Sequence, residues 1–269
     1  MSVLTYHAIV PTAADLEAWP PGARLYVFTL DEFRRHLDHL AAEGFEAISM
    51  ERLVQWHAGE ADLPARPIVV SFDDGHYSNA ELATPALAER DQRAIFFVTA
   101  GHIGRSNTVT WEHLKAMLDA GMEIGSHTLT HRAPSTLTPA ELEHELAESK
   151  RVLEQGTGAA IDYIASPTGY DNRHFARLAR QVGYRAAVQG VIGRNSRDTD
   201  RFALRRFVLK RSHGFDTFCR LVDPADRTYV RMRTKQAARN AVRRLLGPRG
   251  YEAIRRCLLG RSGNVKVNG

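Results

Sequence analysis

Two adjacent carboxylates stand at the end of an apolar run in the first half of the chain. Residues 67–72 read Pro-Ile-Val-Val-Ser-Phe, and Asp73, Asp74 and Gly75 follow directly. Neighbouring side chains in an extended segment point to opposite sides, so the two aspartates can serve different purposes. One can bind a metal ion while the other faces a substrate as a base, and Gly75 lets the backbone turn sharply. The alternative interpretation is a solvated turn that begins a helix.

Two histidines four residues apart form the second chemical pattern. His127 and His131 lie in the stretch Gly125-Ser-His-Thr-Leu-Thr-His131. In a helical turn this spacing would place both rings on one face, where imidazoles can bind a divalent transition metal. Two unrelated surface histidines are the alternative, because the chain has twelve. One carboxylate and two imidazoles make a three-ligand set that leaves metal positions open for water and substrate.

The elements that must position these residues alternate along the first 222 residues. Short apolar segments predict strands at 3–6, 46–49, 67–72, 94–99, 123–126, 161–165, 186–189 and 206–210. Amphipathic segments predict helices at about 31–43, 51–58, 79–90, 111–120, 138–155, 172–182 and 215–222. Repeated βα units of this kind predict an α/β fold, namely a distorted (β/α) barrel.

Polar residues follow several of these predicted strands. Asp73 and Asp74 come after one strand, His127 after another, and the segment 166–169 after a third. In (β/α) barrels the chemistry lies at the C-terminal ends of the strands. We therefore expect these residues to meet at one mouth of the barrel.

The positive charge of the chain is concentrated near its C-terminus. The net charge is +5, but residues 231–269 alone carry eleven Lys and Arg against one acid, Glu252, which leaves the rest at −5. This asymmetry predicts a barrel over 1–222 and a basic, amphipathic helical tail over 223–269. Basic helices with an apolar face are typical of segments that lie on an anionic membrane surface. Packing of those faces on the barrel is the alternative, and no motif indicates nucleic acid as a partner.

The composition is that of a globular protein, with 43% hydrophobic and 25% charged residues. No apolar run approaches the roughly 18 residues that a membrane-spanning helix needs. The first residues lack the basic and apolar regions of a secretory signal. We therefore expect a cytoplasmic protein, peripheral at the inner face of the cell membrane if the tail binds lipid.

The two chemical patterns together resemble motifs of the polysaccharide deacetylase family, which shares the NodB-homology domain and includes the family 4 carbohydrate esterases. Ser71-Phe-Asp-Asp-Gly75 is similar to the first motif, TFDDG, and Ser126-His-Thr-Leu-Thr-His131 is similar to the second, H[ST]xxH. The resemblance covers roughly residues 1–222 and is strongest over 68–131. The pair Tyr6-His7 resembles the opening of many members from the exopolysaccharide branch.

This resemblance implies a metal-dependent deacetylase of bacterial glycan, lipopolysaccharide or exopolysaccharide biosynthesis. Asp73 would be the general base, and Asp74 would bind the metal together with His127 and His131. The ion would be Zn²⁺, with Co²⁺, Ni²⁺ or Mn²⁺ as alternatives. The substrate would be an acylated sugar, either nucleotide-linked or lipid-linked. The substrate-binding residues would be His7, Pro167, Thr168, Gly169 and Tyr170.

The later motifs of the family are only partly present. The third motif, often RPPYG, corresponds to Ile164-Ala-Ser-Pro-Thr-Gly-Tyr170, so Ala165 stands where the arginine that normally pairs with the base would be. The backbone N–H of Thr168 can still help to hold an oxyanion. We interpret the change at Ala165 as a mark of the exopolysaccharide branch.

The general acid of the fifth motif has no direct counterpart. The corresponding segment, 204–209, contains no histidine. His213 is the candidate acid, with His7 and His102 as alternatives. An amine leaves poorly without a proton, so other activities remain open: an O-acetyl esterase, a deformylase, a cyclic-amide hydrolase, or a metal-binding protein without turnover.

Overall fold

The computed structural model describes residues 1–169 and 174–241. The chain divides into two compact units, Met1–Asp226 and a second that begins at Arg227, and each is described by itself. The boundary between residues 222 and 223 that we infer from the sequence stays a prediction.

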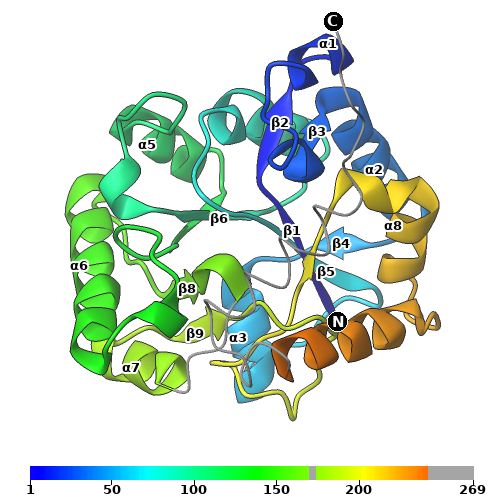
Figure 1. Ribbon diagram of the computed structural model, residues 1–269. Helices are drawn as coiled ribbons and strands as arrows, with labels where there is room; N and C mark the ends of the chain where they lie inside the picture. Colours follow the sequence, from blue (N-terminus) through cyan, green and yellow to red (C-terminus); the bar gives the residue numbers. More distant parts are fainter. Residues whose placement is uncertain (170–173, 242–269) are drawn as a thin grey trace, which may run out of the picture. The chain divides into compact units, whose positions relative to one another are not determined.

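A curled parallel sheet forms the centre of the first unit (Figure 1). In the described residues it has eight strands, in the order β10-β1-β5-β6-β7-β8-β9, with β4 on the edge of β5. Their bounds are β1 Ser2–Tyr6, β4 Glu46–Ala47, β5 Pro67–Phe72, β6 Ile95–Val98, β7 Glu123–Ser126, β8 Tyr163–Ala165, β9 Ala186–Val188 and β10 Phe207–Val208. The strands β9 and β10 form the two ends of the sheet. An isolated bridge joins Val188 of β9 to Leu204, which lies three residues before β10. The predicted (β/α) barrel is therefore confirmed, in an incomplete form.

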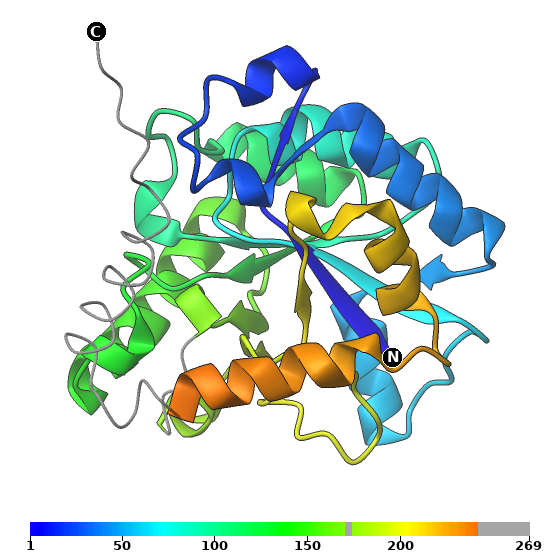
Figure 2. The same cartoon turned by 45° about the vertical axis from the view of Figure 1, so that its right-hand side comes forward.

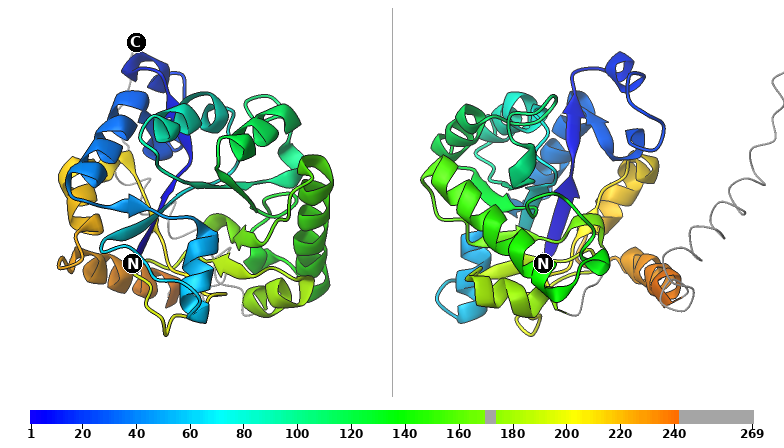
Figure 3. Two further views of the ribbon diagram at one scale, coloured as in Figure 1. Left: turned by 180° about the vertical axis from the view of Figure 1, so that it is seen from behind. Right: turned by 60° about the vertical axis from the view of Figure 1, so that its left-hand side comes forward.

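Helices cover the outside of this sheet (Figures 2 and 3). They are α2 Leu30–Ala42, α4 Thr84–Ala88 after the π-helical turn η2 Asn79–Ala83, α5 Trp111–Asp119, α6 Pro139–Thr157, α7 Phe175–Val182 and α8 Gly214–Val222. The long helix α6 begins at a capping box, in which the Thr138 side chain accepts a hydrogen bond from the Glu141 N–H and Glu141 Oε2 accepts one from the Thr138 N–H. Short 3-10 turns follow several strands: η3 Ala100–His102, η4 Pro134–Thr136, η5 Pro167–Gly169 and η6 Arg211–His213.

Helix α3 (Met50–Ala58) closes the N-terminal end of the barrel. Its Met50, Leu53 and Val54 belong to one buried cluster with inward-facing residues of β1, β5, β6, β8 and β9. The carboxylate of Glu123, the first residue of β7, accepts hydrogen bonds from the backbone N–H groups of Met50 and Glu51. Burial raises the pKa of Glu123 to about 7. With this end filled, only the opposite end of the barrel is left for chemistry.

Two strands and two short helical segments were missed by the sequence analysis. The strands β2 (Ala8–Val10) and β3 (Val27–Thr29) pair in a separate two-stranded sheet, and α1 (Ala13–Leu16) and η1 (Arg24–Tyr26) lie between them in the chain. Each strand has three residues, which is too short for a periodic pattern to be distinguished. This extension follows directly after β1 and therefore borders the mouth of the barrel.

The described part of the second unit contains one helix, residues 228–241. It carries Arg231, Arg233, Lys235 and Arg239 and no acidic residue. Among the helices of the described residues, none combines the length and apolar character needed to cross a membrane. Most of the predicted basic tail, from residue 242 on, lies outside the described residues.

Candidate metal centre

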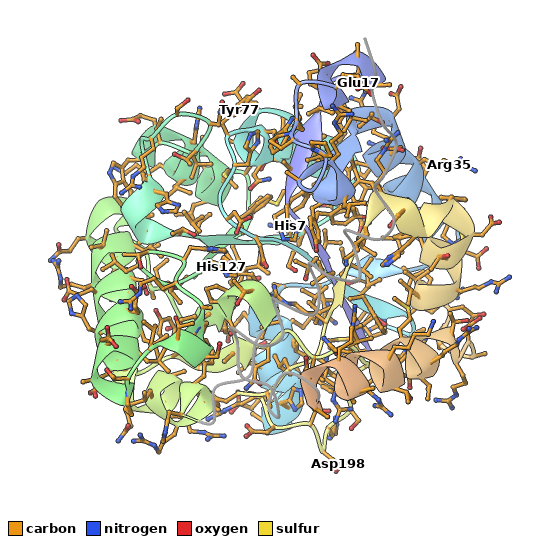
Figure 4. The ribbon with its side chains drawn as sticks, in the orientation of Figure 1. His7, Glu17, Arg35, Tyr77, His127 and Asp198 are labelled. Atoms are coloured by element: carbon orange, nitrogen blue, oxygen red, sulfur yellow. The ribbon has the colours of Figure 1, made fainter. Side chains whose placement is uncertain are left out.

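The strand ends bring the chemically distinctive residues together. Strands β1, β5, β6 and β7 are neighbours in parallel register, so the residues that follow them lie on one edge of the sheet. His7 follows β1, Asp73 and Asp74 follow β5, and His127 follows β7. The backbone N–H of Asp73 donates to the Tyr6 carbonyl at 3.0 Å. Figure 4 shows His7 and His127 near the middle of the ribbon, on the side where these strands end.

Asp74, His127 and His131 form a compact cluster of potential metal ligands. One ligand atom from each lies within 4.8 Å of the other two. Oδ1 of Asp74 is 3.1 Å from Nε2 of His131 and 3.5 Å from Nε2 of His127. Yet this buried oxygen has no hydrogen-bond partner within the described residues. A carboxylate oxygen and two ring nitrogens that converge on one point suit a shared cation.

The backbone of this cluster is held in an uncommon conformation. Asp74 has φ 74°, Thr128 has φ 66° and His131 has φ 61°, all in the left-handed region that non-glycine residues rarely adopt. The expectation that His127 and His131 share a helical turn is therefore wrong, because the segment between them is a loop. The rings still lie with centroids 5.0 Å apart. Backbone strain of this kind is frequent at ligand-binding sites.

The ring of His127 is fixed in one orientation. It is buried, and its Nδ1 lies 3.0 Å from the carbonyl oxygen of Ala165, at the end of β8. That contact places the ring proton on Nδ1 and leaves the lone pair of Nε2 free for a metal ion. Burial lowers the pKa of His127 to about 4, so the ring is neutral at physiological pH.

The loop that carries His131 is held by Glu145, a residue that the sequence analysis missed. Glu145 lies on α6 and is buried, and one carboxylate oxygen accepts hydrogen bonds from the N–H groups of Leu129 and Thr130 at 3.0 and 2.8 Å. Contact with the Asp74 carboxylate raises the pKa of His131. The reverse effect acts on Asp74: burial opposes its ionisation, but contact with His131 and the charges of the nearby histidines outweigh burial and lower its pKa.

His7 stands beside the cluster without belonging to it. It is one of the nearby histidines that lower the pKa of Asp74. Its ring centroid lies 5.0 Å from that of Tyr26. Asn79 donates a hydrogen bond to the His7 carbonyl at 2.8 Å, which fixes the backbone at the end of β1. The ring atom Nδ1 is buried and has no hydrogen-bond partner in the described residues. His7 is thus a half-buried histidine with spare hydrogen-bonding capacity near the ligand cluster.

Asp73 has a charged partner that the sequence analysis did not identify. Nη1 of Arg206 lies 2.8 Å from Oδ1 and 2.7 Å from Oδ2 of Asp73, and both side chains are almost fully buried. Arg206 directly precedes β10. Position 165 has no arginine, but Arg206 supplies an arginine that contacts Asp73. The presence of Arg206 at the start of the predicted strand 206–210 was the sequence signal that could have indicated a buried, paired cation.

The segment after β8 lies close to this ion pair. Nη2 of Arg206 donates to the Ser166 carbonyl at 3.0 Å. Pro167 is buried, whereas Thr168 is exposed and adopts φ 59° within the turn Pro167–Gly169. Tyr170, the last of the expected substrate-binding residues, lies outside the described residues.

His213 occupies a different place. It lines a cavity of about 130 Å³ with residues of β3, α2 and α8, among them Phe28, His36 and Phe218. No member of the ligand cluster lines that cavity. Burial, followed by the charge of Lys210, lowers the pKa of His213. The structure does not bring His213 together with Asp73 or Asp74.

Comparison with known proteins identifies relatives of this site. Residues 60–187 match the family model of the polysaccharide deacetylases. The Bacillus subtilis protein YxkH is 28% identical over 175 residues, which are 65% of this chain and 63% of YxkH. The peptidoglycan-N-acetylglucosamine deacetylase of Bacillus cereus is 25% identical over 122 residues, which are 45% of this chain and 55% of that protein. The chain thus spans less than two thirds of the length of both relatives.

A solved structure shows the same fold. The Streptococcus pyogenes deacetylase PplD, in complex with acetate, matches 83% of this chain and 98% of its own with a TM-score of 0.75. The two are 22% identical in sequence, so the match concerns the arrangement of helices and strands.

Proposed function

Because the chain belongs to the polysaccharide deacetylase family, we propose that it is a metal-dependent hydrolase that removes an acetyl group from an amino sugar of a bacterial cell-surface glycan. The observation that carries the proposal is the ligand cluster of Asp74, His127 and His131 with a second carboxylate, Asp73, beside it. In this proposal one carboxylate binds a cation and the other takes a proton.

The three cluster residues fit a divalent ion, and zinc suits two imidazoles and a carboxylate. Among the described residues, Oδ1 of Asp74 is a buried acceptor without a hydrogen-bond partner, and the Nδ1 contact to Ala165 leaves Nε2 of His127 available. An ion held there would make a water molecule more acidic and draw charge from the acyl oxygen.

Asp73 serves as the general base in this proposal. Its Oδ2 lies 3.6 Å from Nε2 of His127, so the carboxylate borders the cluster without belonging to it. It accepts a proton from the water whose oxygen adds to the acyl carbon. We assign the hydrogen bond to the oxyanion to the backbone N–H of Thr168, an exposed residue in the turn after β8.

His7, rather than His213, is the general acid that we propose. It follows β1, the neighbour of β5 in the sheet, and it is one of the histidines that lower the pKa of Asp74. As the bond from the acyl carbon to nitrogen breaks, the histidine gives its proton to the leaving amine. The products are acetate and a free amino sugar.

We favour an amide over an ester as the bond that is cleaved. An amine needs a proton to leave, and a histidine that binds no metal lies beside the cluster to supply one. The name of the Bacillus cereus relative specifies an N-acetylated sugar. An O-acetyl esterase that uses the same residues is the second candidate.

The substrate of this proposal is a nucleotide-linked or lipid-linked sugar that is met at an anionic membrane surface. Residues 231–269, with their excess of cations, would hold the protein there. In the helix 228–241, four cations occur without an acid, and Ala237, Ala238 and Ala241 are exposed. Each Lys or Arg near such a surface contributes on the order of 1 kcal/mol.

A panel of acylated sugars tests the bond that is cleaved. N-acetyl, O-acetyl and N-formyl derivatives of one amino-sugar oligomer are incubated with zinc-loaded protein, and the released acid is quantified. The proposal expects acetate from the N-acetyl compound at the highest rate. Faster release from the O-acetyl compound would identify an esterase. Release from none, with zinc bound, would leave a binding protein without turnover.

A further inference from the structure

Arg206 is the buried cation of the site that no motif of the sequence explains. Its side chain and that of Asp73 are 2% and 4% exposed, and Nη1 lies within 2.8 Å of both carboxylate oxygens. Nη2 donates to the carbonyl of Ser166 at 3.0 Å. A single guanidinium therefore contacts the residue after β5 and the residue after β8.

These two contacts span the side on which the barrel is incomplete. Arg206 immediately precedes β10, the strand next to β1 at one end of the sheet (yellow beside dark blue in Figure 2). Strand β8 lies near the other end. The backbone of Arg206 is itself fixed there, because its N–H donates to the Val191 carbonyl at 3.0 Å. The guanidinium thus joins the residue after β5 to the residue after β8, on the side where the Val188–Leu204 bridge is a backbone connection between the two ends of the sheet.

We propose that Arg206 is a positioning residue that holds the carboxylate of Asp73 and the turn Pro167–Gly169 at a fixed separation. This inference rests on the proposed function, in which Asp73 is the base and Thr168 N–H meets the oxyanion. Position 165, where the family motif has an arginine, is an alanine, and the carboxylate of Asp73 is instead contacted by the arginine that precedes the last strand and that also contacts the residue after β8.

The hydrogen bonds of Arg206 favour this role over that of a simple buried ion pair. Nε is buried and has no hydrogen-bond partner in the described residues, whereas both Nη atoms are bonded. The side chain therefore makes its hydrogen bonds to Asp73 and Ser166 while its own Nε stays without one. A lysine cannot reproduce the arrangement, because one ammonium on a flexible stem lacks the planar fork that reaches two acceptors.

The test compares Arg206→Met and Arg206→Lys with a matched control, Arg185→Met. Arg185 pairs with Glu51 beside the N-terminus of α3, at the closed end of the barrel, so its loss removes an ion pair without touching the mouth. For each variant, kcat and KM for the N-acetylated oligomer, bound zinc per chain, and the urea midpoint of unfolding are measured. A crystal structure of Arg206→Met completes the set.

We expect kcat of Arg206→Met to fall by about 10²-fold, because a small misplacement of catalytic groups has effects of that size. KM and the zinc content should stay close to those of the natural protein, and Arg206→Lys should lie between the two. Arg185→Met should keep its kcat. In the crystal structure, the Asp73 side chain and the turn Pro167–Gly169 should move while Asp74, His127 and His131 remain in place.

Several results would overturn the inference. They are an unchanged kcat in Arg206→Met, a loss of zinc in parallel with kcat, an equal loss of kcat in Arg185→Met, or the failure of both Arg206 variants to fold. If the natural protein releases no acyl group, the proposed function fails instead. The crystal structure then decides on Arg206 alone, and an unmoved Asp73 and turn would count against it.

Discussion

The two adjacent aspartates differ because the backbone turns between them. Asp73 continues the direction of β5, is buried, and pairs with Arg206. Asp74 adopts φ 74° and thereby turns its carboxylate toward His127 and His131. The two aspartates thus have different partners. Asp73 contacts the guanidinium of Arg206, and Asp74 contacts the imidazole rings of His127 and His131. Their loss should have different consequences.

Asp73→Asn should keep its metal and lose turnover, because it removes a base and leaves the ligand cluster intact. We expect kcat to fall by about 10²–10⁴-fold. Asp74→Asn should bind zinc more weakly as well, since it removes a charged ligand. Elemental analysis of both purified variants, beside their kcat values, measures the two effects. Equal zinc contents and equal rates in the two variants would contradict the division of roles.

Replacement of His7 and of His213 distinguishes the two candidate acids. His7→Gln should lower kcat for an N-acetyl substrate by about 10²–10⁴-fold, because the amine then leaves without a positioned proton donor. His213→Gln should retain nearly full activity, since His213 lines a separate cavity. The matched pair of steady-state measurements is sufficient. A large effect at His213 with a small one at His7 would reverse the assignment.

At the scale of elements, the mouth of the barrel is assembled from segments that are distant in the sequence. All eight strands of the main sheet could be predicted, because apolar runs such as 67–72 and 123–126 are long enough to recognise. The order of the motifs also indicated which residues would meet. The helical turn at His127 was wrong, because left-handed φ angles at Thr128 and His131 depend on tertiary contacts.

The supporting residues could not be predicted for a related reason. Glu145 acts through hydrogen bonds to a loop 15 and 16 residues away in the chain, and Arg206 acts on a carboxylate 133 residues away. A glutamate on an amphipathic helix and an arginine at a strand start have many possible partners. Only the folded arrangement selects one of them.

The contact between Glu123 and the N-terminus of α3 predicts a pH dependence of stability. Burial raises the pKa of Glu123 from 4.5 to about 7 in the folded protein. Below pH 4.5 the carboxyl is protonated in both states and has no effect. As pH rises toward 7, the unfolded state loses the proton first, so this group makes the folded state progressively less stable.

Glu123→Gln removes this dependence. The free energy of unfolding of the natural protein, relative to the variant, should fall by about 2 kcal/mol between pH 5 and pH 8. Urea unfolding of both proteins at several pH values gives the difference, and Glu60→Gln, at an exposed position, serves as the control. If the difference in the free energy of unfolding stays constant or rises with pH, ionisation of Glu123 does not destabilise the folded state and the prediction is wrong.

At the scale of the whole molecule, the charge is divided between an acidic barrel and a basic C-terminal segment. The proposed membrane contact predicts that the full chain sediments with anionic vesicles at low salt, whereas a chain that ends at residue 226 stays in solution. Salt should weaken the binding, because exposed charges are screened within about 10 Å at 0.1 M ionic strength. Neutral vesicles are the matched control. Equal sedimentation of both chains would remove the basic segment from the proposal.

The central claim is that a divalent ion held by Asp74, His127 and His131 is required for acyl release from a sugar. Its most direct measurement is the acetate released from an N-acetylated amino-sugar oligomer by protein depleted of metal with a chelator and then titrated with Zn²⁺. We predict no release before the titration, recovery that saturates at one ion per chain, and no recovery in Asp74→Asn. Full activity of the depleted protein, or equal recovery in the variant, would contradict the account.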